Sequence, residues 1–142
     1  MRKCATVNLT NPMLDRKRLG NAFKALSDPT RLRMLRLLAT NRAELCVCEF
    51  VDTLQERQYN VSKHLKVLEQ SELIEGEKDG RWVYYKLAGA NDPVAGALHR
   101  LVISVPDSDG VFSVDQRRFE DRMSLREDGR CRVGIQTKEL AE

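Results

Sequence analysis

The chain has 142 residues, which is room for one ordinary domain and one appended segment. Hydrophobic residues make up 42% and charged residues 32%, a composition that suits a globular fold and excludes wholesale disorder. No apolar run approaches the roughly 20 residues that cross a bilayer, and no signal peptide is recognisable, so we expect a cytoplasmic protein with reduced cysteines and no membrane partner.

Apolar residues at helical spacing predict five helices before the C-terminal segment. The expected ranges are 13–26, 29–39, 47–55, 58–70 and 93–102. Asp28 is a suitable N-cap for the second helix, and Pro29 suits its first position. Two strands, 73–77 and 81–87, are expected on either side of Lys78-Asp79-Gly80, because Asp-Gly is a strong hairpin signal.

Helix, short turn, helix and β-hairpin is the order of elements in a winged helix-turn-helix. We therefore predict a mainly α fold with a β-hairpin wing, in which residues 1–12 form an N-terminal arm. The DNA-binding and dimerisation domain is expected over residues 13–103. Residues 104–142 are expected to form a C-terminal tail with one short helix, which Ser113 and Gln116 would cap.

The exposed face of the 58–70 helix supports DNA binding. It carries hydrogen-bonding and cationic groups and no acid, with Glu69 at its margin, as a helix in the major groove requires. Residues 13–38 add seven basic residues against two acidic ones, although charge alone is typical of solvated helix faces. His64, at the edge of the apolar stripe, is interpreted first as a packed or capping residue. The candidate DNA contacts are Gln58, Tyr59, Ser62, Lys63 and Lys66 on the helix and Lys78 and Arg81 on the hairpin.

A dimer is expected because one such unit reads only a few base pairs of double-stranded DNA. Phe23, Leu98 and Leu101 exceed what a small core needs, and they are the candidate contacts of a homodimer.

Two cysteines stand one residue apart in Glu44-Leu45-Cys46-Val47-Cys48-Glu49. They are poorly placed for a mutual disulfide but can share a soft ion. Helical periodicity puts each about 100° from Val47, off the packed face, and the helix N-terminus is expected to lower their pKa. In a regular helix the two point about 200° apart, whereas sulfurs on one ion approach to roughly 4 Å. We therefore expect ion binding to reorient the start of this helix and, through it, the recognition helix.

Four motifs in this order resemble the ArsR/SmtB family of metal-responsive repressors, and in particular its arsenic-responsive branch. They are Ala25–Arg33, Glu44–Glu49, Val61–Leu65 and Gly80–Tyr85. The resemblance implies a homodimeric winged helix that represses an arsenic-resistance operon. It also implies that trivalent arsenic or antimony, with no organic cofactor, binds the thiolates and releases the operator DNA.

The sequence departs from the family pattern at two positions. Tyr59 follows Gln58 where the family usually has proline, and Val51 stands where the best-known arsenic site has its third cysteine. Because trivalent arsenic prefers three sulfurs, we expect Cys131 to be the third ligand, with Cys4 as the alternative.

Two other kinds of regulator are open alternatives. A zinc or cadmium sensor of the related branch would use an Asp-x-His pair, but Ala97 stands two residues before His99. A thiol-redox switch would pair Cys46 or Cys48 with Cys131 in a disulfide. An enzyme is the weakest interpretation, because no phosphate loop, glycine-rich cofactor turn or Cys-His-Asp arrangement is recognisable.

Overall fold

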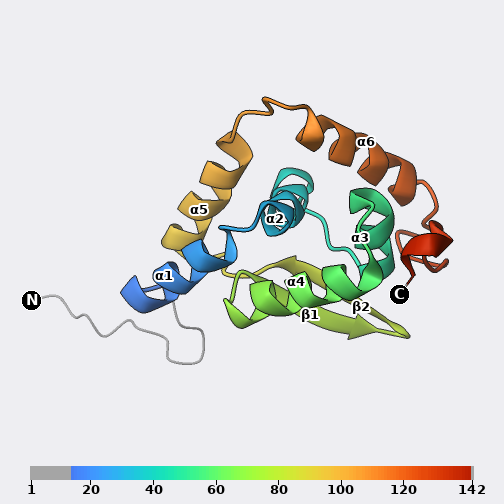
Figure 1. Cartoon of the computed structure of the whole chain (residues 1–142). Helices are drawn as coiled ribbons and strands as arrows, with labels where there is room; N and C mark the ends of the chain where they lie inside the picture. Colours follow the sequence, from blue (N-terminus) through green and yellow to red (C-terminus); the bar gives the residue numbers. More distant parts are fainter. Residues whose placement is uncertain (1–13, 142) are drawn as a thin grey trace, which may run out of the picture.

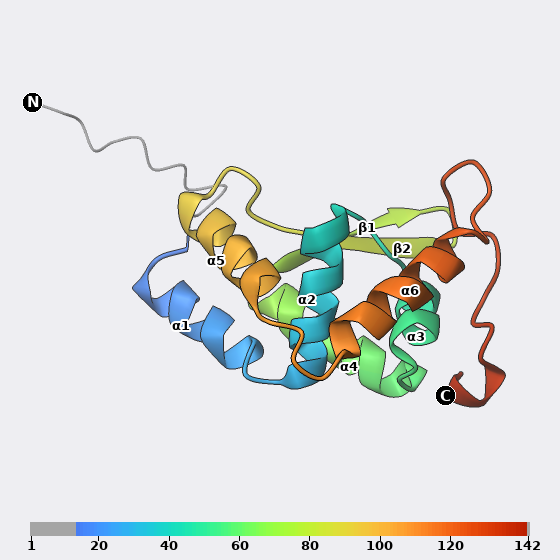
Figure 2. The same ribbon diagram turned by 90° about the horizontal axis from the view of Figure 1, so that it is seen from above.

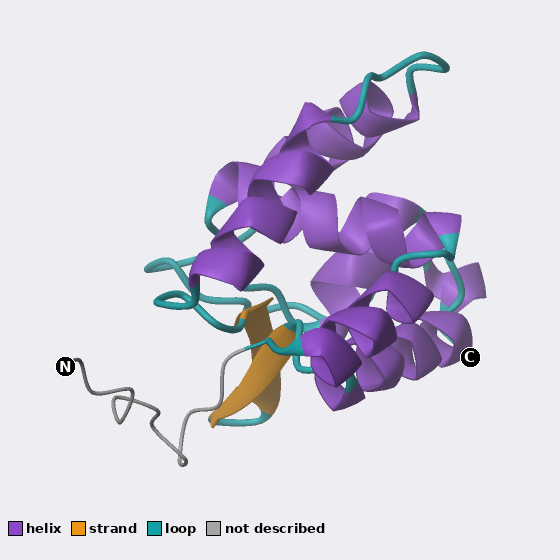
Figure 3. Ribbon diagram, turned by 90° about the vertical axis from the view of Figure 1, so that its left-hand side faces the viewer, coloured by secondary structure: helices purple, strands orange, loops and turns teal. Residues whose placement is uncertain are grey.

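The computed structural model describes residues 14–141, so Cys4 and the rest of the expected N-terminal arm lie outside the described residues. This part of the chain is mainly helical and has a two-stranded antiparallel hairpin (Figure 3), as predicted. Its elements are α1 (Arg16–Ala25), α2 (Pro29–Asn41), α3 (Val47–Leu54), α4 (Gln58–Gln70), β1 (Ile74–Asp79), β2 (Trp82–Leu87), α5 (Pro93–Ser104), α6 (Val111–Met123) and the 3-10 turn η1 (Lys138–Leu140). None of the helices in the described range is long and apolar enough to span a bilayer.

The helix-turn-helix, formed by α3 and α4, packs against the central helix α2. In Figure 1, α2 is at the centre, α1 and α5 lie on one side of it, and α3 and α6 lie on the other. Helix α4 and the hairpin run along the lower edge. Phe50 of α3, Leu65 of α4 and Leu38 of α2 are fully buried in one shared core, which sets the position of α4 relative to α3.

Aspartate is the N-cap residue of α1, α2 and α5. The Asp28 carboxylate accepts hydrogen bonds from the backbone N–H groups of Thr30 and Arg31, at 2.8 and 3.1 Å. Pro29 follows it at the first helical position, where its missing N–H removes no helical hydrogen bond. The predicted start of α2 is therefore confirmed.

The hairpin loop lies one residue later than predicted. Asp79 is paired with Trp82 as the last pair of the ladder, so Gly80 and Arg81 form the two-residue loop. Gly80 has a φ of +65°, which glycine adopts at little cost at the first position of such a loop. The shift places Arg81 at the tip of the wing and leaves Lys78 within β1.

The candidate dimer residues separate into two groups. Leu98 is buried in the core of the chain itself, so this burial removes it from a dimer surface. Phe23 on α1 and Leu101 on α5 are 52% and 55% exposed. Large apolar side chains at this exposure, on two helices at one end of the fold, are consistent with a surface that a second copy covers.

The expected short C-terminal helix is a full element of the fold. Helix α6 has 13 residues, packs on α3 and α2, and contributes Phe119 to the main core. It begins after Gly110, and the expected Ser113 cap instead donates its hydroxyl to Asp107 at 2.5 Å. The sequence predicted a C-terminal tail with a short helix but not this packing, because the apolar stripe of α6 is interrupted by charged residues.

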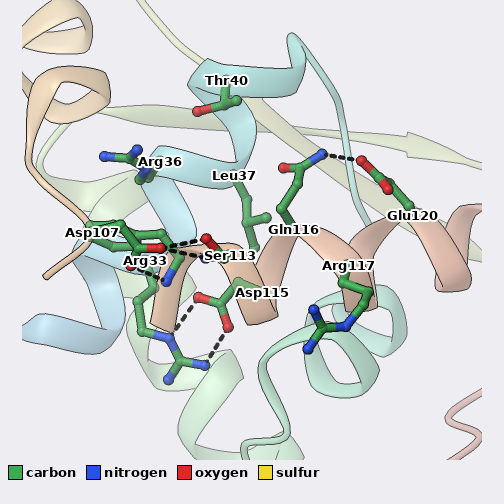
Figure 4. A pocket seen from close by; sticks show the side chains of 11 residues that line it. Arg33, Arg36, Leu37, Thr40, Asp107, Ser113, Asp115, Gln116, Arg117 and Glu120 are labelled. Carbon is green, nitrogen blue, oxygen red and sulfur yellow. Dashed lines mark hydrogen bonds and ion pairs between the residues drawn. The ribbon is translucent and has the colours of Figure 1, made fainter. Parts of the chain in front are cut away.

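An ion pair joins α6 to α2. Figure 4 shows Arg33 and Asp115 facing each other beside a hollow between these helices, and the guanidinium donates two hydrogen bonds to the carboxylate at 2.8 and 2.9 Å. Arg36 likewise donates to the carbonyl oxygens of Val102 and Val105. Part of the basic charge in residues 13–38 therefore holds the fold together and is not free for a polyanion.

Candidate metal centre and DNA-binding surface

Three cysteines from two distant segments meet at the start of α3. The sulfur atoms of Cys46 and Cys48 are 3.0 Å apart, and those of Cys48 and Cys131 are 3.6 Å apart. All three lie within 4.8 Å of one another. An ion that binds thiolates at about 2.3 Å needs its sulfurs within roughly 4 Å of each other, so small adjustments of the side chains would complete a three-sulfur site.

The backbone conformation of Cys46 brings the first two sulfurs together. Cys46 is the N-cap of α3 and is extended, with φ −87° and ψ 171°, so the pair is not held in a regular helical turn. The preceding residue, Leu45, exchanges two backbone hydrogen bonds with Tyr85 of β2, which fixes the chain as it enters α3. The expectation that ion binding must reorient the helix start is therefore wrong, because the sulfurs are adjacent without it.

Cys131 is held in place by the wing. Its backbone N–H donates to the Tyr84 hydroxyl at 2.9 Å, and its thiol lies 3.1 Å from the carbonyl oxygen of Val133. Tyr84 is itself buried on β2. The segment after α6 thus returns to α3 and to the hairpin, as Figure 2 shows from above.

All three thiols are buried, with exposed fractions of 1% for Cys46, 5% for Cys48 and 0% for Cys131. The expectation that the first two lie off the packed face is wrong, because residues after α6 cover that side of α3. The expected lowering of the pKa is wrong for Cys46. The hydrogen bond with Cys48, together with burial, raises the pKa of Cys46, and burial raises the pKa of Cys131.

A buried carboxylate organises the start of α3. The Glu49 side chain is fully buried and accepts the backbone N–H of Cys46 at 3.1 Å. Arg126 donates to both oxygens of the same carboxylate at 2.7 and 2.8 Å, and this hydrogen bonding raises the pKa of Arg126. Sequence reasoning missed Glu49, although its position three residues after the N-cap is that of a capping box.

A second buried ion pair holds the C-terminal segment against α3. Asp52 accepts from Arg122 at 2.6 Å and from the backbone N–H groups of Gln136 and Thr137 at about 3.0 Å. Arg122 also donates to the carbonyl oxygens of residues 133 and 134. Burial alone would lower the pKa of Arg122, but the hydrogen bond and charge of Asp52 raise it, so the guanidinium remains charged.

The donor set consists of three sulfurs. Among residues 14–141, no other histidine, cysteine or carboxylate joins the group formed by Cys46, Cys48 and Cys131. Glu49 is near, but Arg126 and the N–H of Cys46 engage its oxygens. A structural zinc site normally has four tetrahedral ligands, whereas three soft sulfurs with no fourth ligand suit a three-coordinate soft ion.

Six of the seven candidate DNA contacts are exposed. Tyr59, Ser62, Lys63 and Lys66 of α4 are exposed, Gln58 is half-buried, and Lys78 and Arg81 of the hairpin are exposed. The Lys63 ammonium lies 5.1 Å from the centre of the Tyr59 ring, and the Arg81 guanidinium lies 4.6 Å from that of Trp82. These contacts leave the charges accessible to phosphate groups.

His64 is half-buried and faces α2 rather than solvent. Its Nδ1 lies 3.2 Å from a guanidinium nitrogen of Arg31, and burial lowers the pKa of His64. This position agrees with its interpretation as a packed residue.

The part of the chain that contains α2, α3 and α4 is similar to known proteins. The profile of the family described as "Bacterial regulatory protein, arsR family" matches residues 28–75. An uncharacterised HTH-type transcriptional regulator of Methanocaldococcus jannaschii is 39% identical over 69 residues, which cover 49% of this chain and 76% of that protein. The arsenical resistance operon repressor of Escherichia coli is 42% identical over 66 residues, which cover 46% of this chain and 56% of the repressor.

A solved structure has the same architecture. The homodimeric winged helix-turn-helix DNA-binding domain from Mycobacterium bovis superposes with a TM-score of 0.54 at 28% identity, covering 66% of this chain and 82% of that domain. The chain spans little more than half the length of the E. coli repressor, and the matched profile ends within β1. Cys46 and Cys48 therefore lie within the matched residues, whereas Cys131 and the segment after α6 lie outside them.

Proposed function

Because this chain belongs to the arsR family of bacterial regulatory proteins, we propose that it is a homodimeric transcriptional repressor that trivalent arsenic or antimony releases from its operator. The inducer binds the sulfurs of Cys46, Cys48 and Cys131. The observation that carries this proposal is the buried cluster of three sulfurs without a fourth donor in the described part of the chain.

Charge favours a trivalent inducer over a divalent metal. Three thiolates and one trivalent arsenic form a neutral group, whereas three thiolates and one Zn²⁺ or Cd²⁺ carry a net negative charge. The nearest guanidinium groups, Arg122 and Arg126, are already paired with Asp52 and Glu49 and cannot balance that charge fully. Burying an uncompensated charge is costly, so the enclosed site selects the neutral product.

The inducer site contacts both parts of the DNA-binding unit. Cys46 and Cys48 begin α3, which packs on the recognition helix α4. Cys131 is bonded to Tyr84 of the wing. Bonds from one ion to all three sulfurs would therefore join the start of α3 to the segment that is bonded to the wing, so that even a small shift of the sulfurs acts on both DNA-contacting elements. A near-complete switch of occupancy requires a difference in binding free energy of about 5.5 kcal/mol between the two conformations.

The test is arsenite titration of a complex between the full chain and a duplex selected by the protein from a random DNA library. We expect arsenite to release the duplex at a stoichiometry of one per protomer, as followed by fluorescence anisotropy and mobility shift. Zinc at the same concentration should leave most of the complex intact. A complex that is insensitive to arsenite, or that zinc dissociates at lower concentration, would contradict the proposed inducer.

The pH dependence of binding distinguishes the two kinds of inducer. Arsenous acid is neutral and condenses with three neutral thiols to give one arsenic trithiolate and three molecules of water, so no net proton is released. A divalent metal displaces the thiol protons, and its affinity rises by as much as about a thousandfold for each pH unit below the thiol pKa. The raised pKa of Cys46 and of Cys131 keeps these thiols protonated at neutral pH. We therefore expect the arsenite concentration for half-release to change little between about pH 6 and 7.5, and a steep decrease with rising pH would indicate a divalent metal site instead.

A thiol-redox regulator is the second candidate, and the 3.6 Å between the sulfurs of Cys48 and Cys131 favours it. Oxidation by hydrogen peroxide would join the two thiols in a disulfide, with two molecules of water as the product. Mass spectrometry of peroxide-treated protein distinguishes the candidates. A specific disulfide that releases DNA at low peroxide supports redox sensing, whereas release by arsenite under reducing conditions supports the metalloid repressor.

A further inference from the structure

A positively charged hollow lies where the wing meets the C-terminal segment. Its volume is about 370 Å³, and it is lined by the hairpin tip, with Arg81, and by the segment after α6, with Arg130 and Arg132. Figures 1 and 2 show that the segment after α6 returns to the end of the hairpin, although the two are far apart in the sequence. Asp79 is the acidic residue in the lining.

Of the three arginines, Arg81 and Arg132 have guanidinium groups that can bind an anion, whereas Arg130 is already paired with carboxylates. Arg130 is paired with Asp79 at 3.0 Å and with Glu44 at 2.5 Å, so its charge is balanced. Arg81 stacks on Trp82, which leaves its guanidinium facing outward. Arg132 is exposed, and its one hydrogen bond in the described part of the chain is a long one, 3.5 Å, to the carbonyl oxygen of Cys131. The hollow therefore has an excess of positive charge and the dimensions to admit a phosphate group.

The position of Arg132 is fixed by its neighbours. Arg130 lies over the Tyr84 ring, 4.6 Å from its centre, and bonds to Asp79 of β1. The N–H of Cys131 bonds to the Tyr84 hydroxyl, and residues 127 and 130 close a turn with two backbone hydrogen bonds. The segment is thus attached to the wing through Arg130 and Cys131, and the next residue, Arg132, lines the same hollow as the hairpin tip.

We propose that residues 130–132 extend the DNA-contacting surface of the wing, and that Arg132, beside Arg81 in the lining of the hollow, binds a DNA backbone phosphate of its own. This inference rests on the proposed function, because it assigns the wing to DNA. Its consequence is that an inducer ligand, Cys131, and a phosphate contact, Arg132, are adjacent residues of one segment. A change in the position of Cys131 on inducer binding then acts on a DNA contact directly, without transmission through α3 and α4.

The test compares the salt dependence of DNA binding for the wild-type chain with that of Arg132→Ala, Arg81→Ala and Arg118→Ala. Each phosphate contact contributes about 0.9 to the slope of log affinity against log salt concentration, so a homodimer should lose about two units in each of the first two variants. We expect the affinity of both variants for a mixed-sequence duplex and for the selected duplex to fall by similar factors. Arg118 is exposed on α6, away from the hollow, and its variant should match the wild type.

The outcomes separate this inference from the proposed function. If Arg81→Ala lowers the slope and Arg132→Ala does not, residues 130–132 are not a DNA contact, although the protein is still a DNA-binding repressor. If the wild-type chain binds no duplex, the proposed function itself fails. Far-ultraviolet circular dichroism of Arg132→Ala should be unchanged, because the side chain is exposed.

Discussion

Replacement of Cys48 by serine should strongly weaken the response to arsenite. The Cys48 sulfur lies between the other two, 3.0 Å from that of Cys46 and 3.6 Å from that of Cys131. Its loss removes both of these close sulfur pairs. We expect the arsenite needed for half-release to rise by on the order of a hundredfold or more, which corresponds to about 2.7 kcal/mol. The measurement is arsenite titration of the complex with the selected duplex.

Cys131→Ser is the matched comparison. It keeps the close Cys46–Cys48 pair, so the half-release concentration should rise only about tenfold, or about 1.4 kcal/mol. Both variants should bind DNA as the wild type does in the absence of arsenite. Equal, small effects in the two variants would mean that the sulfur cluster is structural, and a larger effect of Cys4→Ser would move the third ligand to the N-terminal arm.

Removal of the Asp52 carboxylate should destabilise the whole protein. Asp52→Ala leaves the buried Arg122 guanidinium without its partner and removes the acceptor of two backbone N–H groups, those of Gln136 and Thr137. Loss of one partner of a buried ion pair typically lowers the free energy of unfolding by about 3–5 kcal/mol. Urea unfolding followed by circular dichroism measures this effect.

Two variants control the Asp52 experiment. Asp121→Ala, at an exposed position of α6, should change the free energy of unfolding by less than about 0.5 kcal/mol. The double variant Asp52→Leu/Arg122→Met should recover only the part of the loss that the unpaired guanidinium causes, because the backbone N–H groups of Gln136 and Thr137 still lack their acceptor. A loss below about 1 kcal/mol for Asp52→Ala would show that the ion pair does not hold the C-terminal segment in place.

The arrangement of the winged helix could be predicted because its determinants are local. The Asp28-Pro29 cap, the apolar stripes of α3 and α4 and the glycine of the hairpin act over a few residues, and each specifies its own element. The hairpin loop was misplaced by one residue because the choice between adjacent turns depends on the register of the whole ladder.

The sequence by itself determined the fold class, the exposed basic face of α4 and the presence of a cysteine pair at the start of a helix. Only the tertiary structure decided that this pair is buried, that the pKa of Cys46 is raised, and that Cys131 completes a cluster with a residue 83 positions away. The physical reason is that the thiols are buried by contacts between α3 and the segment after α6. The same contacts bring the charges of Glu49, Asp52 and Arg122 close to the thiols. Such contacts leave no periodic signal in either segment, so the character of the site is a property of their packing.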